Sequence, residues 1–552
     1  MEFSEHIKTA NVEDVVLRVG FRAPRSGALC VTGHHLLFSD REEDSTWQLL
    51  LLIRNIDAIE KSVENLLGYP QGSKASQKQR TSGSSGSIVI KCKDLRVLQL
   101  DIPGMEECLN IASSIEVHVV YCVLCLTPTD FHSPGLQRVR PPLQDLLHLL
   151  PTLTTNHNII RKHHSPWRLL TNPNLHFSST SPFPAVFVDV FLLSISSFRQ
   201  QYTVPYMFLK YIFKSNSSNW LIGFQVIMRS SQPLTGANKK RCCEDELLLQ
   251  MAIDQSELGY IVDTRSSQHA QHARLSGGGF ESKSCYRPWR RLHRHMERGK
   301  VLQESLIKLV EACGDSSHNM DRWLSKLENS KWLSHVHSAL STAGLVAECV
   351  ERDGHSVLVH GSEGTDTTLL VTSLAQIILD PDCRTFRGFL RLLEREWVQA
   401  GHPFQQRCAR SAYSHARLKY ECPSFLLLMD CVWQISRQFP LALEFSEALL
   451  LRLGQEAYAS DYGTFLCNSE QERHTFHVKE NTHCLLWFLM QCSEREHYIN
   501  PLYEHTQLAI WPSVQPQSLQ LWTGLFLRWT EHTQVMDEAR EEIRTLVNEL
   551  KR

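Results

Sequence analysis

Residues 355–380 read HSVLVHGSEGTDTTLLVTSLAQIILD. The apolar run HSVLVH is typical of a buried strand, and TTLLVTSLAQIILD is typical of a helix. Between them lies GSEGTD, a short loop with two glycines. A strand, a glycine-bearing loop and a helix N-terminus form an anion site, because unpaired backbone N–H groups and the positive helix end point into the loop. The pattern therefore predicts an α/β domain with a candidate phosphate loop.

The loop lacks both side chains that a cysteine-dependent phosphatase needs. Such an enzyme opens the loop with a Cys thiolate and closes it with an Arg that holds the phosphate oxygens. Here Gly361 stands at the opening position and Thr367 at the closing position. The loop keeps Glu363 and Asp366 without a cation, and like charges about 4 Å apart repel by roughly 1 kcal/mol in water. We therefore expect the loop to oppose a phosphate dianion.

Ser362 is an alternative nucleophile, and His360 is the nearest base that could activate it. His360 ends the predicted strand, where a packed and hydrogen-bonded histidine is the simpler interpretation. The esterase motif G-x-S-x-G is not matched, because Gly361 and Gly364 have a different spacing around Ser362. An enzyme with another nucleophile is therefore kept only as an alternative to a non-catalytic protein.

The composition is that of an ordinary globular protein with several domains. The 552 residues contain 57 Lys and Arg against 59 Asp and Glu, a formal net charge of −2. This balance argues against a nucleic-acid binder, which usually has a basic domain. The 17 Cys are an odd number without regular spacing, and the first residues show no signal peptide, so reduced thiols in the cytoplasm are expected.

Neither a metal site nor a membrane span is expected. Cys122 and Cys125 have the C-x-x-C spacing of a zinc site, but no second pair of ligands stands beside them. The most apolar stretch, residues 183–198, is shorter than the roughly 20 residues of a spanning helix and contains Asp189. We expect no cofactor, and membrane association only at the periphery.

The remaining sequence divides into four parts. Residues 1–116 alternate short β-type runs with Gly, Ser and Pro before a helical segment, which is the order of a PH-like domain. Residues 117–223 contain no Glu and show no sustained period, so they are interpreted as a linker or insertion, or as sequence from a mis-joined exon. Residues 224–530 alternate strands and helices, which predicts a central sheet with helices on both faces. The fourth part is residues 533–552.

In residues 533–552 an apolar seam recurs at alternating steps of three and four residues, as in a coiled coil. The seam, a candidate partner-binding surface, consists of Met536, Ala539, Ile543, Leu546 and Leu550. An amphipathic surface helix is the alternative, because two heptads are fewer than the three or four of a well-marked coiled coil.

A cluster of basic residues between positions 287 and 295 is interpreted as one face of a helix. It comprises Arg287, Arg290, Arg291, His293, Arg294 and His295. Such a face would either contact anionic lipid or simply be solvated.

The candidate loop resembles that of the myotubularin family of phosphoinositide 3-phosphatases. Active members have His-Cys-Ser-Asp-Gly-Trp-Asp-Arg-Thr where this chain has HGSEGTDTT, residues 360–368. The similarity extends to stretches that cover most of residues 224–530, among them YIVDTRS (260–266), GGGFES (277–282) and REWVQAGHPFQQRC (395–408). Residues 117–223 show no match to the family pattern.

The resemblance implies an α+β multi-domain protein: a PH-like (GRAM) domain at 1–116, a cysteine-phosphatase-like domain at 224–530 and a shortened coiled coil at 533–552. It implies that Gly361 replaces the nucleophile and Thr367 the phosphate-binding Arg, whereas Asp366 keeps the position of the general acid. The vestigial loop then comprises His360, Gly361, Ser362, Glu363, Gly364, Thr365, Asp366, Thr367 and Thr368.

The resemblance further implies a function. Family members without the catalytic pair bind active relatives, stabilise them and raise their activity. The implied partners are myotubularin-related proteins 6, 7 and 8, which act on phosphatidylinositol 3-phosphate and its 3,5-bisphosphate. The complex is then expected in the cytoplasm and on endosomal or other internal membranes. A phosphoinositide-binding membrane adaptor without a phosphatase partner is the alternative.

Overall fold

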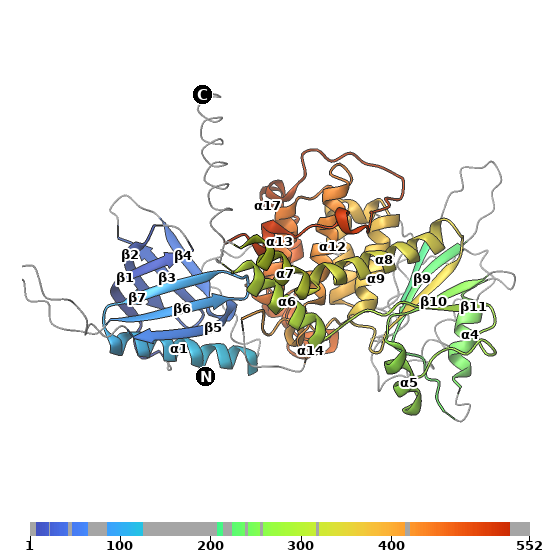
Figure 1. Ribbon diagram of the computed structural model, residues 1–552, viewed down its shortest axis with the longest axis horizontal. Helices are drawn as coiled ribbons and strands as arrows, with labels where there is room; N and C mark the ends of the chain where they lie inside the picture. The colour runs from blue at the N-terminus through green and yellow to red at the C-terminus, as the bar shows by residue number, and fades with distance from the viewer. Residues whose placement is uncertain are drawn as a thin grey trace, which may run out of the picture.

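The computed structural model describes residues 7–20, 23–41, 47–63, 85–124, 207–212, 224–237, 241–253, 258–315, 319–413 and 420–529. Within these ranges the chain forms a β-rich domain at one end, a layer of helices in the middle and a second sheet at the other end (Figure 1).

The N-terminal domain is a seven-stranded antiparallel sheet with one helix packed against it. Its strands, in the order β4-β3-β2-β1-β7-β6-β5, are β1 (Asn11–Val19), β2 (Arg25–Val31), β3 (His35–Asp40), β4 (Gln48–Leu52), β5 (Ile56–Val63), β6 (Gly86–Cys92) and β7 (Val97–Ile102), and helix α1 (Met105–Leu124) follows them. Every second residue of β7 is buried, and Leu100 meets Ile111 and Ile115 of α1 in one cluster. The predicted β-rich N-terminal domain is therefore confirmed, and its helix continues past residue 116.

The second domain is built on a five-stranded sheet in the order β11-β10-β12-β9-β8. Its strands are β8 (Met207–Ile212), β9 (Phe224–Ser230), β10 (Gly259–Asp263), β11 (Trp289–His293) and β12 (Ser356–His360). Neighbouring strands run parallel, except that β8 is antiparallel to β9. Every residue of the central strand β12 is buried, as in a parallel strand that is covered on both faces. The parallel strands end at one edge of the sheet, where the candidate loop begins.

The helices of the second domain enclose the sheet and form the middle layer. They are α4 (Cys243–Met251), α5 (Ser267–Leu275), α6 (Lys300–Cys313), α7 (Met320–Ser330), α8 (Trp332–Glu351), α9 (Thr367–Leu379), α10 (Phe386–Leu393), α11 (Phe404–Arg407), α12 (Ser424–Gln438), α13 (Glu447–Tyr458), α14 (Glu470–Thr475), α15 (Val478–Asn481), α16 (Leu485–Leu489), α17 (Cys492–Arg495) and α18 (Thr523–Phe526). The short elements of this domain are the 3-10 helices η6 (Asp382–Arg384), η8 (Glu496–Tyr498) and η9 (Pro516–Ser518) and the π-helix η7 (Glu394–Val398), whereas the 3-10 helix η2 (Ile53–Asn55) lies between β4 and β5 of the N-terminal domain.

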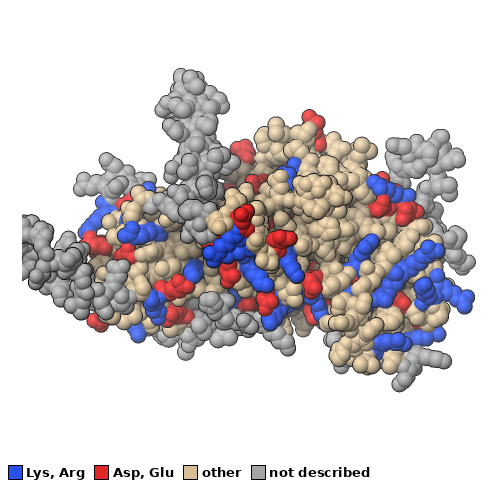
Figure 2. Space-filling model, viewed as in Figure 1, with Lys and Arg blue, Asp and Glu red and all other residues tan. Residues whose placement is uncertain are grey.

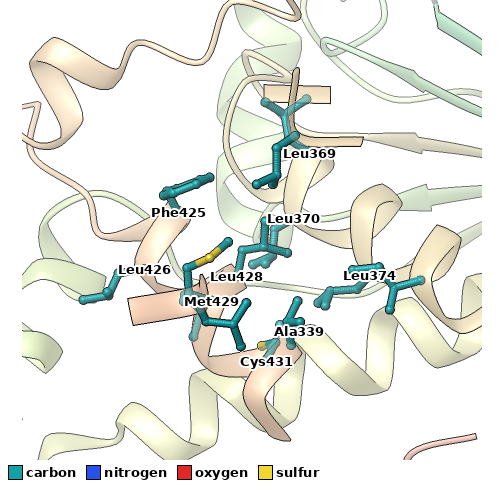
Figure 3. Packing of buried hydrophobic residues seen from close by; sticks show 14 of the residues in the cluster. Ala339, Leu369, Leu370, Leu374, Phe425, Leu426, Leu428, Met429 and Cys431 are labelled. Carbon is teal, nitrogen blue, oxygen red and sulfur yellow. The ribbon is translucent and has the colours of Figure 1, made fainter. Parts of the chain in front are cut away.

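Helix α9 is the centre of the core, because all 13 of its residues are buried. Its residues Leu370 and Leu374 lie with Leu428 of α12 in the largest apolar cluster (Figure 3). On the other face of the sheet, Leu249 of α4 lies in a smaller cluster with Ile261 of β10. The predicted sheet with helices on both faces is therefore confirmed, and it holds both ends of the candidate loop rigidly.

A polar seam joins the two domains. The carboxylate of Asp57 in β5 accepts hydrogen bonds from the backbone N–H groups of Ser411 at 3.1 Å and Tyr413 at 2.9 Å. The Tyr413 hydroxyl donates to the carbonyl oxygen of Leu95 at 3.1 Å. The segment after α11 is thus fastened to the N-terminal domain at two points.

We predict that Glu421→Gln stabilises the chain in a pH-dependent manner. Glu421 is only 5% exposed in this seam, and burial together with the charge of Asp57 raises its pKa from 4.5 to about 7. Between these two values the unfolded chain releases a proton that the folded chain keeps, so stability falls as the pH rises through 7. The variant should gain about 1–2 kcal/mol in the free energy of unfolding near pH 8. At pH 4.5 it should gain little. Denaturant unfolding at both pH values checks this, and equal gains would contradict it.

Candidate functional site: the loop between strand β12 and helix α9

The strand, loop and helix lie where the sequence pattern predicts them. β12 ends at His360 and α9 begins at Thr367, with Asp366 at its N-terminal boundary. The Asp366 side chain makes no capping hydrogen bond to α9. Instead it accepts hydrogen bonds from Arg407 at the end of α11 and from Ser424 at the start of α12. The carboxylate therefore links α11 and α12 to the loop and does not cap α9.

A pair of threonine hydroxyls occupies the start of the loop. Thr367 Oγ1 lies 2.8 Å from Thr264 Oγ1, and the Thr264 hydroxyl donates to the carbonyl oxygen of His360 at 3.1 Å. Thr264 has one hydroxyl proton, so Thr367 is the donor within the pair. A Cβ built on Gly361 would lie 3.1 Å from the Thr264 oxygen and 3.3 Å from the Thr367 oxygen. The space beside Gly361 is therefore already taken by polar side chains.

The acidic side chains of the loop were expected to lack a positive partner, but the structure supplies one. Arg407 at the end of α11 donates from Nε to Asp366 Oδ1 at 3.0 Å and from Nη2 to Asp366 Oδ2 at 2.8 Å. Burial alone would raise the pKa of Asp366, but Arg407 outweighs it and holds that pKa below its usual value. Arg407 Nη2 also donates to the more exposed Glu363 at 3.3 Å. The prediction of a loop without a cation is wrong, because a distant segment supplies one.

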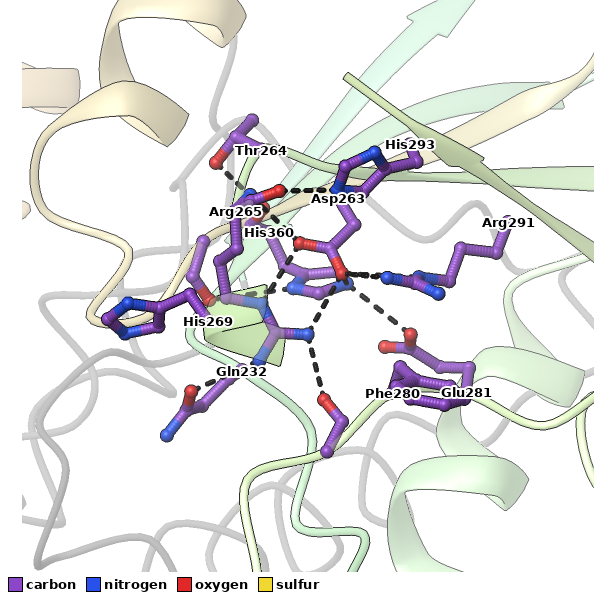
Figure 4. Close-up of polar contacts among 12 residues, drawn as sticks. Gln232, Asp263, Thr264, Arg265, His269, Phe280, Glu281, Arg291, His293 and His360 are labelled. Atoms are coloured by element: carbon purple, nitrogen blue, oxygen red, sulfur yellow. Dashed lines mark hydrogen bonds and ion pairs between the residues drawn. The ribbon is translucent and has the colours of Figure 1, made fainter. Parts of the chain in front are cut away.

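His360 lies behind the loop, inside a buried ionic network. Its Nε2 lies 3.3 Å from Glu281 Oε2 and 3.9 Å from Asp263 Oδ2 (Figure 4). Burial would lower the pKa of His360, but these two carboxylates outweigh it and raise the pKa above its ordinary value. The other ring nitrogen, Nδ1, lies 3.5 Å from the carbonyl oxygen of Gly361, so both ring nitrogens have neighbours other than Ser362. Among the described residues, the Ser362 hydroxyl finds no hydrogen-bond partner, so the geometry gives no support to a Ser–His nucleophile.

Arg265 ties this network to the neighbouring loop. It forms a bidentate pair with Asp263, with both N···O distances at 2.9 Å. The same guanidinium donates to the carbonyl oxygens of Gly278 at 2.8 Å and Gly279 at 2.7 Å (Figure 4). Arg291 of β11 donates to Asp263 from the other side, at 2.6 Å. Two arginines thus stabilise one buried carboxylate at the carboxyl end of β10.

His402 supports the other side of the loop. Its Nδ1 lies 2.7 Å from the carbonyl oxygen of Thr365 and 3.5 Å from Asp366 Oδ1. Burial lowers the pKa of His402 to about 4, although Asp366 acts in the opposite direction. The ring is therefore neutral at physiological pH and donates its Nδ1 hydrogen to the loop backbone.

The loop sequence by itself predicts no role for Asp263, Arg265, Glu281, His402 and Arg407. The stretches YIVDTRS, GGGFES and REWVQAGHPFQQRC contain all five, and their similarity to the family was the only available signal. Folding brings them to one edge of the sheet.

The basic cluster was assigned to the wrong element. Residues 289–293 form β11, an edge strand, and not a helix face. Neighbouring side chains on a strand point to opposite sides, so Arg291 reaches inward to Asp263 while Arg290 is exposed. Arg287 and Arg294 are also exposed. Lys and Arg side chains gather over the end of the molecule that carries this sheet (Figure 2).

We predict that Gly364→Ala destabilises the chain by about 1–3 kcal/mol. Gly364 has a φ of +79°, and a Cβ on it would lie 2.8 Å from the Ser230 carbonyl oxygen in β9. Gly401 is a matched control, because its φ is +81° but nothing lies within 4 Å of a Cβ there. Gly401→Ala should cost only the backbone strain. Equal losses in denaturant unfolding would contradict the steric argument.

Several predicted features lie outside the described residues. These are the tail residues Met536, Ala539, Ile543, Leu546 and Leu550, the apolar stretch 183–198, and Cys125. Within the described ranges, no group of three or more His, Cys, Asp or Glu side chains is arranged to hold a metal ion. Likewise, none of the helices that the structure describes has the length and apolar character needed to span a membrane.

Comparison with known proteins decides the family. The model of the Myotubularin-like phosphatase domain matches residues 151–474, more than half of the chain. The chain belongs to the myotubularin family. The resemblance drawn from the sequence is therefore confirmed. The match begins inside residues 117–223, so the expectation that this segment shows no similarity to the myotubularin family is wrong for residues 151–223.

The relatives include several myotubularin-related proteins. The chain is 48% identical to human Myotubularin-related protein 9, over 99% of this chain and 94% of the relative. It is 30% identical to human Phosphatidylinositol-3,5-bisphosphate 3-phosphatase MTMR8, over 98% of this chain and 73% of the relative. It is 29% identical to human Phosphatidylinositol-3-phosphate phosphatase MTMR7, over 96% and 77% respectively. The chain thus combines a myotubularin-like phosphatase domain with an N-terminal β-rich domain.

Proposed function

We propose that this chain is a catalytically inactive myotubularin that acts as a regulatory or adaptor subunit of active phosphoinositide 3-phosphatases. The observation that carries the proposal is the hydroxyl pair of Thr264 and Thr367 beside Gly361, in a loop that belongs to a phosphatase-like domain. Glycine offers no nucleophile there, and threonine offers no positive charge for a phosphate group.

The thiols nearest the loop are poor substitutes for the missing nucleophile. Cys422 accepts a hydrogen bond from the backbone N–H of Gly299 at 3.2 Å. Burial, with a smaller contribution from Asp366, raises the pKa of Cys422 to about 12, and burial raises that of Cys408 to about 12 as well. Only a thiolate attacks phosphorus readily. Both groups stay protonated at neutral pH, which supports a non-catalytic role.

The buried network around the loop supports a structural role for this region. Arg407 neutralises Asp366, and Arg265 and Arg291 neutralise Asp263, so these cations are engaged by protein carboxylates. The loop therefore stabilises the domain fold while it lacks the groups for phosphate transfer. A stable domain without catalytic activity can still bind and stabilise another protein.

The partners that we propose are active members of the same family, namely myotubularin-related proteins 6, 7 and 8. The relatives named MTMR7 and MTMR8 are phosphatases of phosphatidylinositol 3-phosphate and 3,5-bisphosphate according to their names. We propose pairing through the tail seam of residues 533–552 as a coiled coil, and a cytoplasmic complex that associates with endosomal or other internal membranes. The substrates of these phosphatases are membrane lipids, so a complex with such a phosphatase must reach a membrane surface.

The test is phosphate release from phosphatidylinositol 3-phosphate vesicles by purified MTMR7, with and without this chain. We expect no release by this chain alone and a clear rise in the mixture. The Ile543→Asp variant is the control, because it should fold normally and fail to pair. Release by the chain alone would refute catalytic inactivity. An unchanged rate in a mixture that forms no complex would refute the regulatory role.

A peripheral membrane adaptor is the second candidate function. It is supported by three exposed arginines, Arg290 in the edge strand β11 and Arg287 and Arg294 on either side of that strand. Basic side chains near a surface are attracted to anionic lipid by roughly 1 kcal/mol each. Sedimentation with phosphoinositide vesicles, comparing Arg290→Glu with Lys300→Glu as an exposed control, separates the two functions. A phosphatase partner would be unnecessary for this binding.

A further inference from the structure

Helix α7 has an apolar stripe that is wider than the face it packs against the core. Met320, Trp323, Leu324 and Leu327 recur at helical spacing along it. Leu327 packs against the main core cluster and Trp323 is half-buried. Met320 and Leu324, by contrast, are 65% and 49% exposed. The outer half of the stripe therefore faces solvent, on a helix that is otherwise well formed.

The ends of α7 are fixed, so the exposure is not a consequence of a frayed helix. Asn319 caps the N-terminus by accepting a hydrogen bond from the backbone N–H of Arg322 at 3.0 Å. At the other end, the Ser305 hydroxyl of α6 donates to the carbonyl oxygen of Ser330 at 2.7 Å. A well-ordered helix with an exposed apolar face can bind the apolar face of a second amphipathic helix.

The C-terminal segment of this chain has a matching stripe. From Met320 to Leu324 to Leu327 the steps are four and three residues, and from Met536 to Ala539 to Ile543 they are three and four. Two helices with these steps bring their apolar residues together when they run antiparallel. Over these residues both stripes cover seven steps along the chain, about 10 Å of helix at 1.5 Å per residue.

The described chain ends beside the N-terminal domain, next to residues that also contact the segment 411–413, and that segment contacts α6. The indole of Trp529 donates to the carbonyl oxygen of Asp94 at 3.0 Å, and the Arg96 guanidinium lies 4.5 Å from the ring centroid. The adjacent residue Leu95 accepts the hydroxyl of Tyr413. The Gln303 side chain of α6 donates to the carbonyl oxygen of Ser411, two residues before Tyr413, at 2.9 Å. Figure 1 places α6 and α7 on the side of the helical layer toward the β-rich domain.

The tether between Trp529 and the tail seam is short. Six residues lie between Trp529 and Met536, and the seven steps of an extended chain cover at most about 25 Å. A segment held this close has an effective concentration in the millimolar range toward a neighbouring surface. A contact between the two stripes with an intrinsic Kd below about 1 mM would then be populated within a single molecule.

We propose that residues 533–552 dock on the outer face of α7, formed by Met320, Trp323 and Leu324, when no other helix covers their seam. The docking holds within one chain and does not require a phosphatase partner. If the seam also binds a partner, as proposed above, the two contacts compete for the same apolar residues. Weakening the α7 face would then raise partner affinity, whereas damage to the seam would abolish it.

The test is hydrogen–deuterium exchange of the purified full chain, read by mass spectrometry at the amides of residues 536–550. We expect measurable protection in the monomer and at least a tenfold loss of it in Leu324→Asp. Leu109→Asp is the matched control, because Leu109 on α1 is a 44% exposed leucine on a different helix. Light scattering on the same samples identifies the monomer, and the amides of α9 report that each variant is folded.

Three results would overturn the proposal. Tail amides that exchange equally fast in the wild type and in Leu324→Asp would show no docking on this face. Protection that survives Leu324→Asp would place the tail elsewhere. Protection found only in a dimer fraction would make a second copy the occupant. If Leu324→Asp also lowers protection in α9, Met320→Asp replaces it, since Met320 is the more exposed of the two.

Discussion

Arg407→Ala is expected to destabilise the chain by about 3–5 kcal/mol at neutral pH, because it leaves a buried carboxylate without its counter-charge. Arg407 makes two hydrogen bonds to Asp366, and it also donates to the carbonyl oxygen of Tyr420 at 2.8 Å. Without it, the Asp366 carboxylate keeps the Ser424 hydroxyl at 3.2 Å and the neutral His402 ring at 3.5 Å, and Arg298 acts on it only as a weaker charge.

The loss should depend on pH with a definite sign. Arg407 holds the pKa of Asp366 below its usual value, so the pair stabilises the fold above that value and loses its effect as the pH falls through the lowered one. In the variant, burial instead favours the protonated acid. Denaturant unfolding should therefore show a smaller deficit at pH 4.5 than at pH 7.5.

Arg298→Ala is the control for this prediction. Arg298 lies 3.8 Å from Glu363, a side chain that is 57% exposed, and is itself about one-third exposed. Ion pairs of this kind contribute about 0–1 kcal/mol. A similar loss in both variants would mean that the loop responds to any reduction in positive charge, and that the buried pair has no special importance.

Replacing Ile543 and Leu546 together by Asp should lower the affinity of this chain for an active myotubularin more than a hundredfold. In the proposed coiled coil both side chains lie in the seam, where a charged group loses its hydration without gaining a partner. Each tenfold loss of affinity corresponds to about 1.4 kcal/mol of binding free energy. A hundredfold loss therefore requires about 2.8 kcal/mol. Two buried charged groups can supply this cost. Co-precipitation of the purified chains with MTMR7 measures it.

Thr545→Asp is the matched control, since Thr545 lies between these two positions but outside the seam. Binding that is unchanged in the double variant would exclude the tail as the pairing surface. Binding that is lost in the control as well would indicate a general effect of negative charge, and the seam would then not be its cause.

Local sequence pattern was sufficient for the strand and helix that hold the loop. The apolar run 356–360 and the helix from residue 367 are determined by neighbouring residues, so their periodicity reveals them. The position of His360 at the end of a buried strand also indicated a packed histidine. The structure places it in such a setting, although its partners Glu281 and Asp263 lie far away in the sequence.

The electrostatics of the loop could not be predicted in the same way. Asp366 and Arg407 are 41 residues apart, and only the fold brings them into contact. Counting charges within the loop therefore suggested an unbalanced acidic site. The prediction of a basic helix face was wrong for a related reason. The spacing of these residues fits one face of a helix, but Arg290 and Arg291 lie on the edge strand of a sheet.

If the chain is inactive, as proposed, the hydroxyl pair beside Gly361 makes it hard to restore catalysis by a single mutation. A cysteine at position 361 alone would crowd two oxygens at 3.1 and 3.3 Å, and it would still lack a guanidinium across the loop. An arginine at position 367 alone would break the bond to Thr264 at 2.8 Å and serve no nucleophile. Under the proposed function, each single step carries a structural cost without a catalytic gain, so both positions would have to change together.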